Sequence, residues 1–126
     1  MADEGLKLGI ETIRSLLFSS ISSTYFGITS VGLLNPARLI CFTNTTNSNL
    51  FVAITVNATA PASDGTADQI IVPANGFKLL DIMTNHYPQD GSPMQITQGS
   101  QLWARTATGS SNPTSGFIYA EVYYGH

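Results

Sequence analysis

Short runs of β-branched and aromatic residues, separated by clusters of Asn, Gly, Pro and Ser, recur along this chain of 126 residues. Such runs are typical of β-strands, and the clusters between them are typical of turns. The clearest run is 50–56, in which every second residue from Leu50 to Val56 is a large aliphatic one. A period of two residues places these side chains on one face of a strand. The pattern predicts an all-β fold.

The spacing of the runs predicts about eight strands. We expect them at 13–21, 25–29, 37–43, 50–56, 69–72, 77–83, 101–106 and 117–124. The longer segments 58–68 and 85–93 have the composition of loops. Short antiparallel strands at this spacing favour a single-domain β-sandwich over residues 13–126, and more specifically a jelly roll.

The last predicted strand has two apolar faces. Ile118, Ala120 and Val122 alternate with residues that include Tyr119 and Tyr123. A strand of this kind is either central in its sheet or has its second face covered by another subunit.

Residues 1–12 are predicted to form an N-terminal arm. Leu6, Leu8 and Ile10 alternate with small or polar residues, as they would in an extended segment. The alternative is a short helix in which Leu6, Ile10, Ile13 and Leu17 share one stripe, but two glycines disfavour it. An extended arm with three aliphatic residues has to cover either its own sandwich or the sheet edge of a neighbouring chain.

Charged residues make up only 10% of the chain, whereas soluble domains average about 25%. Uncharged polar residues, with 13 Ser and 14 Thr among them, take their place. Five basic residues and a net charge of −3 are too little positive charge for direct nucleic-acid binding. No apolar run approaches the roughly 18 residues of a membrane span, and the acidic start differs from a secretory signal. We therefore expect no membrane association.

The sequence has too few reactive side chains for us to expect that the protein is an enzyme. The histidines are His86, in a predicted loop, and His126, the last residue. No Gly-x-Ser-x-Gly pattern, phosphate-binding glycine loop or metal-ligand spacing is present. The loop 64–68 lacks the distal Glu of a calcium-binding EF-hand. The single cysteine, Cys41, lies in an apolar run and is expected to be a small buried hydrophobe. We predict no catalytic residue, no metal site and no cofactor.

Several aromatic residues invite two interpretations. Trp103, Tyr87 and the tyrosines of 117–124 could stack on a sugar ring, as in a lectin-like site. The favoured alternative is that they belong to the core or to a subunit interface, where Tyr and Trp are enriched and charge is depleted.

The order of segments resembles that of small virion structural proteins of tailed, and especially short-tailed, bacteriophages. The resemblance spans nearly the whole chain except 58–68 and is carried by IRSL at 13–16, SSISS at 19–23, PAR at 36–38, FTNTT at 42–46, PANGFKLLD at 73–81, GSQLW at 99–103 and FIYAEVYY at 117–124. It implies a sandwich subunit present in many copies, which is made in the bacterial cytoplasm and located in the virion.

The function expected from this resemblance is that of a capsid decoration or cement protein that binds and stabilises the assembled head. Its partners would be the major capsid protein or other virion proteins, together with copies of itself. The near alternative is a head–tail connector, collar or tail component, and the alternative of another class is a lectin-like receptor-binding module. The residues expected at the interface are Leu6, Leu8, Ile10, Trp103, Tyr119 and Tyr123.

Overall fold

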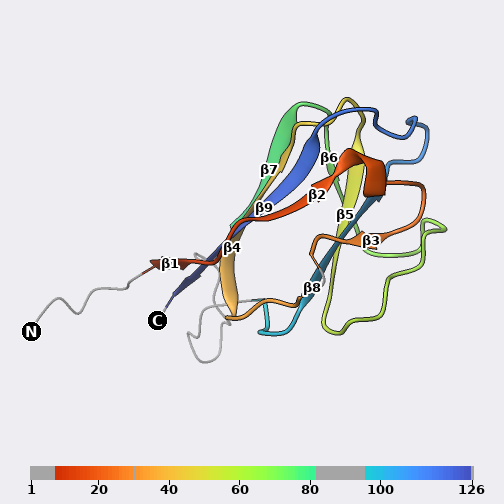
Figure 1. Ribbon diagram of the computed structural model, residues 1–126. Helices are drawn as coiled ribbons and strands as arrows, with labels where there is room; N and C mark the ends of the chain where they lie inside the picture. Colours follow the sequence, from red (N-terminus) through yellow and green to blue (C-terminus); the bar gives the residue numbers. More distant parts are fainter. Residues whose placement is uncertain (1–7, 30, 82–95, 126) are drawn as a thin grey trace, which may run out of the picture.

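The computed structural model describes residues 8–29, 31–81 and 96–125 and consists of two antiparallel β-sheets packed face to face (Figure 1). Within these residues the only helical segment is the short 3₁₀ turn η1 (Phe18–Ser20). The strands are β1 (Leu8–Ile10), β2 (Arg14–Leu17), β3 (Phe26–Gly27), β4 (Ala37–Asn44), β5 (Leu50–Thr55), β6 (Ile70–Val72), β7 (Gly76–Asp81), β8 (Gln101–Thr106) and β9 (Phe117–Gly125). The predicted all-β, single-domain sandwich is confirmed.

The five-stranded sheet has the order β1-β9-β4-β7, with β2 pairing with β9 further along the same edge as β1. The four-stranded sheet has the order β3-β8-β5-β6. Strand β9 therefore lies between β4 on one side and β1 and β2 on the other, so the first of the two predicted alternatives, a central strand, is the one that the structure shows.

The core lies between the two sheets and is built from alternate residues of the strands that line it. Ile118, Ala120 and Val122 of β9 are fully buried, and so is Phe42 of β4. Leu50, Val52, Leu102 and Ala104 approach them from β5 and β8. Burial of each large aliphatic or aromatic side chain stabilises the fold by about 1.5–3 kcal/mol.

Two predicted strands are shorter in the structure than in the sequence-based expectation. The segment 13–21 forms a strand only over β2, because the chain then turns and the Ile21 N–H donates to the Phe18 carbonyl at 3.0 Å. The segment 25–29 forms only β3, and Thr29 adopts a left-handed φ of 69°, which a strand does not accommodate. The predicted extent of both strands was wrong.

Other predicted boundaries agree more closely with the structure. The segment 101–106 coincides with β8, and 58–68 contains no strand, as expected of a loop. The predicted strand 77–83 corresponds to β7, and its last two residues lie outside the described residues. The predicted loop 85–93 also lies outside them.

The end of the predicted N-terminal arm is extended. Leu8–Ile10 pairs antiparallel with the last residues of β9, and the helical alternative is wrong for this segment. The ring of Tyr124 lies over Gly9, where it occupies the space that a Cβ atom would need. Glycine thus allows an aromatic ring to cover its backbone at this edge.

A buried ion pair closes one end of the sandwich. The Arg14 Nη2 atom donates to Glu11 Oε1 at 2.7 Å, and Nη1 donates to the Val31 carbonyl at 2.7 Å. Glu11 Oε2 accepts the Asn35 backbone N–H at 2.8 Å. Burial raises the pKa of Glu11, but the hydrogen bonds from Arg14, Asn35 and Leu34 lower it further, so that the net pKa lies below its ordinary value. These contacts fix the segment that leads into β4.

A buried amide organises the opposite end of β4. Asn44 Nδ2 donates to the carbonyls of Ser48 at 2.9 Å and Val72 at 3.0 Å, and its Oδ1 accepts the Thr46 N–H at 2.9 Å. Because Val72 belongs to β6, this one side chain connects the two sheets and the predicted turn after β4.

Candidate interaction surface

The outer face of the five-stranded sheet is rich in apolar side chains. Directly paired residues of antiparallel strands point to the same face. Tyr119 pairs with Thr43, which pairs with Phe77, and this row faces away from the core. The pairs Cys41–Leu79 and Leu39–Tyr123 form parallel rows beside it. We call this surface the open face and define it by Ile10, Leu17, Leu39, Cys41, Phe77, Leu79, Phe117, Tyr119 and Tyr123.

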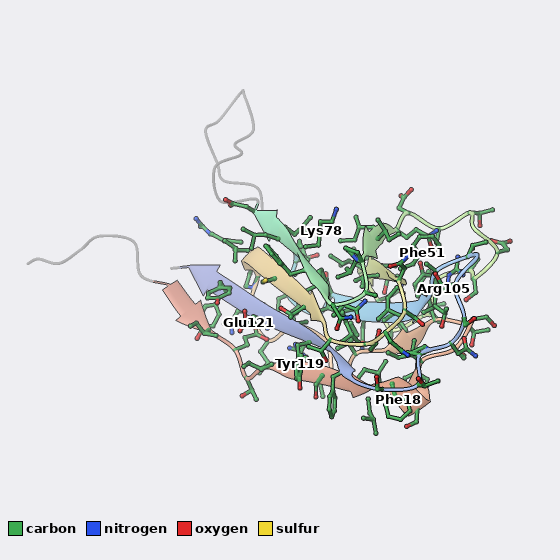
Figure 2. The ribbon with its side chains drawn as sticks, turned by 90° about the horizontal axis from the view of Figure 1, so that it is seen from above. Phe18, Phe51, Lys78, Arg105, Tyr119 and Glu121 are labelled. Carbon is green, nitrogen blue, oxygen red and sulfur yellow. The ribbon has the colours of Figure 1, made fainter. Side chains whose placement is uncertain are left out.

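Several members of the open face are strongly exposed. The exposed fraction is 66% for Phe77, 61% for Ile10 and 49% for Leu79. Tyr119 is half-buried and stacks on Phe117, with their ring centroids 5.4 Å apart. Figure 2 shows Tyr119 on β9 at one side of the sandwich, away from Phe51 and Arg105. Exposed apolar side chains gathered on one sheet face make that face a candidate interaction site.

Carboxylates lie on the same sheet face as the apolar residues. Glu121 pairs with Cys41, and Asp81 pairs with Leu39. Glu121 is half-buried between the tyrosines of β9, and Figure 2 labels it close to Tyr119. A partner of this face would have to accommodate both the apolar side chains and the carboxylate of Glu121.

The environment of Cys41 differs from the one predicted from the sequence. Its register places it on the open face opposite Leu79 and Glu121, and the side chain is half-buried rather than in the core. The prediction of a buried hydrophobe was wrong because β4 contains an irregularity between Ala37 and Leu39, which sets the phase of the alternation after it.

The structure brings together part of the predicted interface. Ile10 pairs with Tyr123, and Tyr119 lies two residues before Glu121 on the same face of β9. The backbone of Leu8 pairs with that of Gly125, whereas Leu6 lies outside the described residues.

Trp103 is not part of this surface. It lies on β8 in the other sheet, opposite Ala53. Phe77 and Leu79 were missed from the predicted interface, although their alternation with Lys78 already indicated a strand with one apolar face.

Trp103 borders an apolar cavity of about 480 Å³ beside the edge of the four-stranded sheet. Tyr25, Phe26 and Gly27 contribute to its wall, and Phe26 is 53% exposed. The indole N–H of Trp103 donates to Thr55 Oγ1 at 2.8 Å, which fixes the ring. Burial raises the pKa of the Tyr25 hydroxyl, although the nearby Arg105 guanidinium lowers it in part.

Neither a metal-binding cluster nor a membrane-spanning helix occurs in the described segments. No three His, Cys, Asp or Glu side chains lie close enough there to hold a metal ion. No helix in the same segments is long and apolar enough to cross a bilayer. His86 and His126 lie outside the described residues.

The fold and the open face together define a β-sandwich with an uncovered apolar sheet face. No family model and no curated protein matches the chain. Among solved structures, the chain is similar to the Anabaena sensory rhodopsin transducer, with 18% sequence identity and a TM-score of 0.34 over 83% of this chain and 96% of that chain. This similarity is too weak to carry an argument about function.

Proposed function

We propose that the protein is a bacteriophage virion structural protein, and specifically a capsid decoration or cement protein that binds the assembled head. The observation that supports this proposal is the open face, on which apolar residues of β1, β2, β4, β7 and β9 form one surface. The resemblance of the sequence to virion structural proteins of tailed phages supplies the class of partner, a shell protein.

A cement protein acts by binding the assembled shell more tightly than it binds free shell subunits. Its occupancy then stabilises the assembly by mass action, and many copies act together through avidity. Apolar contacts suit this role because they depend little on salt. The sparse charge of the chain, 10% of its residues, is consistent with such contacts.

We further propose that the fold is a jelly roll. From β2 onwards the chain crosses to the other sheet after every strand except β5, which is followed by β6 in the same sheet. The resulting orders are β2-β9-β4-β7 and β3-β8-β5-β6. These orders support two interlocked Greek keys, the arrangement of jelly rolls in viral capsid domains.

The docking proposal is tested by polar substitutions on the open face. Phe77→Gln combined with Leu79→Gln removes two exposed apolar side chains from β7 and leaves the core intact. Binding to expanded capsid shells of the phage that encodes this chain is measured by co-sedimentation. We expect the affinity to fall at least about tenfold, since two exposed side chains of this size supply more than 1.4 kcal/mol when buried.

The matched control is Ile71→Gln, which changes a 45% exposed apolar residue on the outer face of the other sheet. It should leave shell binding unchanged. Cys41 provides a second readout, because it is the only cysteine of the chain and lies on the open face. Shell binding should slow the reaction of its thiol with a maleimide. Equal loss of binding in both variants, or an unchanged thiol rate, would contradict docking through this face.

The cavity beside Trp103 favours a second candidate function, a lectin-like receptor-binding module. Its apolar wall with Tyr25, Phe26 and Trp103 offers aromatic faces for a sugar ring. Because Trp103 is the only tryptophan, its fluorescence reports this cavity directly. A saturable change during titration with neutral monosaccharides would support the lectin-like function, whereas no change up to tens of millimolar would exclude it.

A further inference from the structure

Arg105 is buried on the outer face of the four-stranded sheet. Its strand neighbours Leu102 and Ala104 face the core, and Arg105 pairs with Phe51 on the opposite face. Only 4% of the residue is exposed. The guanidinium carbon lies 4.9 Å from the ring centroid of Phe51 and 5.2 Å from that of Tyr25. Figure 2 shows Phe51 and Arg105 side by side. The cation is therefore held between two aromatic faces.

The loop after β5 contributes to this burial. The backbone N–H of Tyr25 donates to Ser63 Oγ at 2.9 Å, and the Tyr25 hydroxyl donates to Gln69 Oε1. In Figure 1 this loop, drawn in yellow-green, extends alongside β3. Tyr25 is thereby fixed over the guanidinium and is itself only 6% exposed.

The guanidinium has few hydrogen-bond partners for a buried group. Nε and Nη2 have none in the described part of the chain, and Nη1 makes one bond of 3.4 Å to the Thr106 carbonyl. Nε and Nη2 form the edge of the fork that binds a carboxylate through two parallel hydrogen bonds. Buried polar groups are normally paired, so an unpaired fork points to a ligand.

Arg105 borders a cavity of about 330 Å³ whose remaining wall is mainly hydroxyl groups and one amide. The side chains of Ser23, Thr108 and Ser110 make no hydrogen bond within the described residues. Asn112 Oδ1 accepts the Thr106 hydroxyl at 2.8 Å, and its amide N–H₂ is unused there. The cavity thus combines one cation with several neutral donors, which is the inventory needed to bind an anion that also carries hydroxyl groups.

One carboxylate lies in the vicinity of the Arg105 guanidinium. Asp64 lies near enough to Arg105 for the guanidinium to contribute to lowering its pKa, although hydrogen bonds from Thr66 contribute more. The carboxylate partly offsets the attraction of the guanidinium for any anion. The two parallel N–H groups of the fork offer the geometry that a carboxylate accepts through both of its oxygens.

We propose that this cavity, the Arg105 pocket, binds the carboxylate of a small hydroxylated acid of the uronic-acid class. The carboxylate pairs with Nε and Nη2 of Arg105, and the ligand hydroxyls meet the side chains of Ser23, Thr108, Ser110 and Asn112. Both fork atoms are covered in the ligand-free protein, so the guanidinium turns towards the cavity on binding. In the described residues this turn breaks the long hydrogen bond to Thr106 and the contacts of the guanidinium with the rings of Phe51 and Tyr25, and the bonds to the ligand have to replace both. The proposal does not depend on docking to a capsid.

Calorimetric titration of the full-length chain with D-glucuronate, D-glucose, acetate and inorganic phosphate, at constant ionic strength, tests this proposal. We expect glucuronate to bind at least about tenfold more tightly than each of the other three. Equal affinity for glucose would contradict recognition of the charge, and equal affinity for acetate would contradict contacts to the hydroxyls. Tighter binding of phosphate would overturn the assignment of a carboxylate, and no heat with glucuronate at tens of millimolar would overturn the site itself.

Substitutions test whether glucuronate binds in the Arg105 pocket. Arg105→Met should abolish glucuronate binding, and Arg105→Lys should weaken it at least about tenfold because an ammonium group lacks the fork. Thr108→Tyr narrows the cavity from an exposed position and should abolish binding with Arg105 intact, which keeps the test valid if the Arg105 variants do not fold. Arg38→Gln, the control for loss of one positive charge, should bind as the unchanged protein does. Unaltered binding by Thr108→Tyr would contradict the location.

Discussion

Single polar residues at the two ends of β4 carry hydrogen bonds that the apolar core cannot supply. The buried Asn44 side chain donates hydrogen bonds to three carbonyl groups and accepts hydrogen bonds from two donors of Thr46. The ion pair between Glu11 and Arg14 fixes the segment that precedes β4. Removal of one partner leaves the others buried and unpaired, which costs more than the bond itself contributes.

Asn44→Ala should lower the free energy of unfolding by about 2–4 kcal/mol, because the bonds that the Asn44 side chain donates to three carbonyl groups and accepts from Thr46 are lost in the interior. Chemical denaturation followed by tryptophan fluorescence measures the change. Asn57→Ala, in the exposed loop, is the control and should change stability by less than about 0.5 kcal/mol. A similar loss in both variants would show that Asn44 has no special role.

Glu11→Gln should destabilise the protein by about 3–5 kcal/mol at neutral pH, since it leaves the buried Arg14 without its carboxylate. The folded-state pKa of Glu11 lies below the ordinary value of 4.5, so its stabilisation is fully present above about pH 4.5 and is lost as the pH falls through the folded value. The difference between the two proteins should therefore shrink in acid. Unfolding curves from pH 7 to pH 3 measure it, and a difference that stays constant would contradict this role.

At the scale of single elements, the N-terminal strand depends on one glycine. Gly9→Val should displace the Tyr124 ring and weaken the pairing of β1 with β9. We expect amide hydrogens of Leu8–Ile10 to exchange at least about tenfold faster, and those of β5 and β8 to exchange at an unchanged rate. The control Thr12→Val changes an exposed neighbour and should have no such effect. Unchanged exchange in β1 would mean that the ring is not needed there.

Strands could be predicted where their signal is local. The alternation in 101–106 depends only on adjacent residues, and β8 has those bounds. The strand β1 was anticipated only as an extended arm, since its pairing with β9 joins the two ends of the chain. The end of β3 could not be predicted, because no feature of the sequence indicates that Thr29 adopts a left-handed φ.

The candidate surface could be predicted only in part. Tyr119 and Tyr123 followed from the two apolar faces of 117–124. Phe77 and Leu79 joined them through the register between β4 and β7, which a single sequence does not specify. Arg105 was not singled out, because its burial depends on Phe51 of β5 and on Tyr25, which precedes β3.

At the scale of the whole molecule, the sparse charge and the open face suit binding to a large apolar surface. If the open face supplies most of the binding energy, the affinity for capsid shells should change less than about threefold between about 0.05 M and 0.5 M NaCl, because apolar contacts are not screened. Co-sedimentation at several salt concentrations measures this dependence. A fall of a hundredfold would indicate that exposed charges, rather than the open face, make the main contacts.

In the proposed function, the open face covers part of an assembled shell. Under the proposed function the chain is encoded by a phage, and the most direct test is cryo-electron microscopy of the purified phage particles. We predict many copies distributed over the head, each with the face of β7, β4 and β9 against the capsid. A ring of copies at one vertex would assign the chain to the connector or collar instead. Absence from the particle, or an open face turned towards solvent in every copy, would contradict the account.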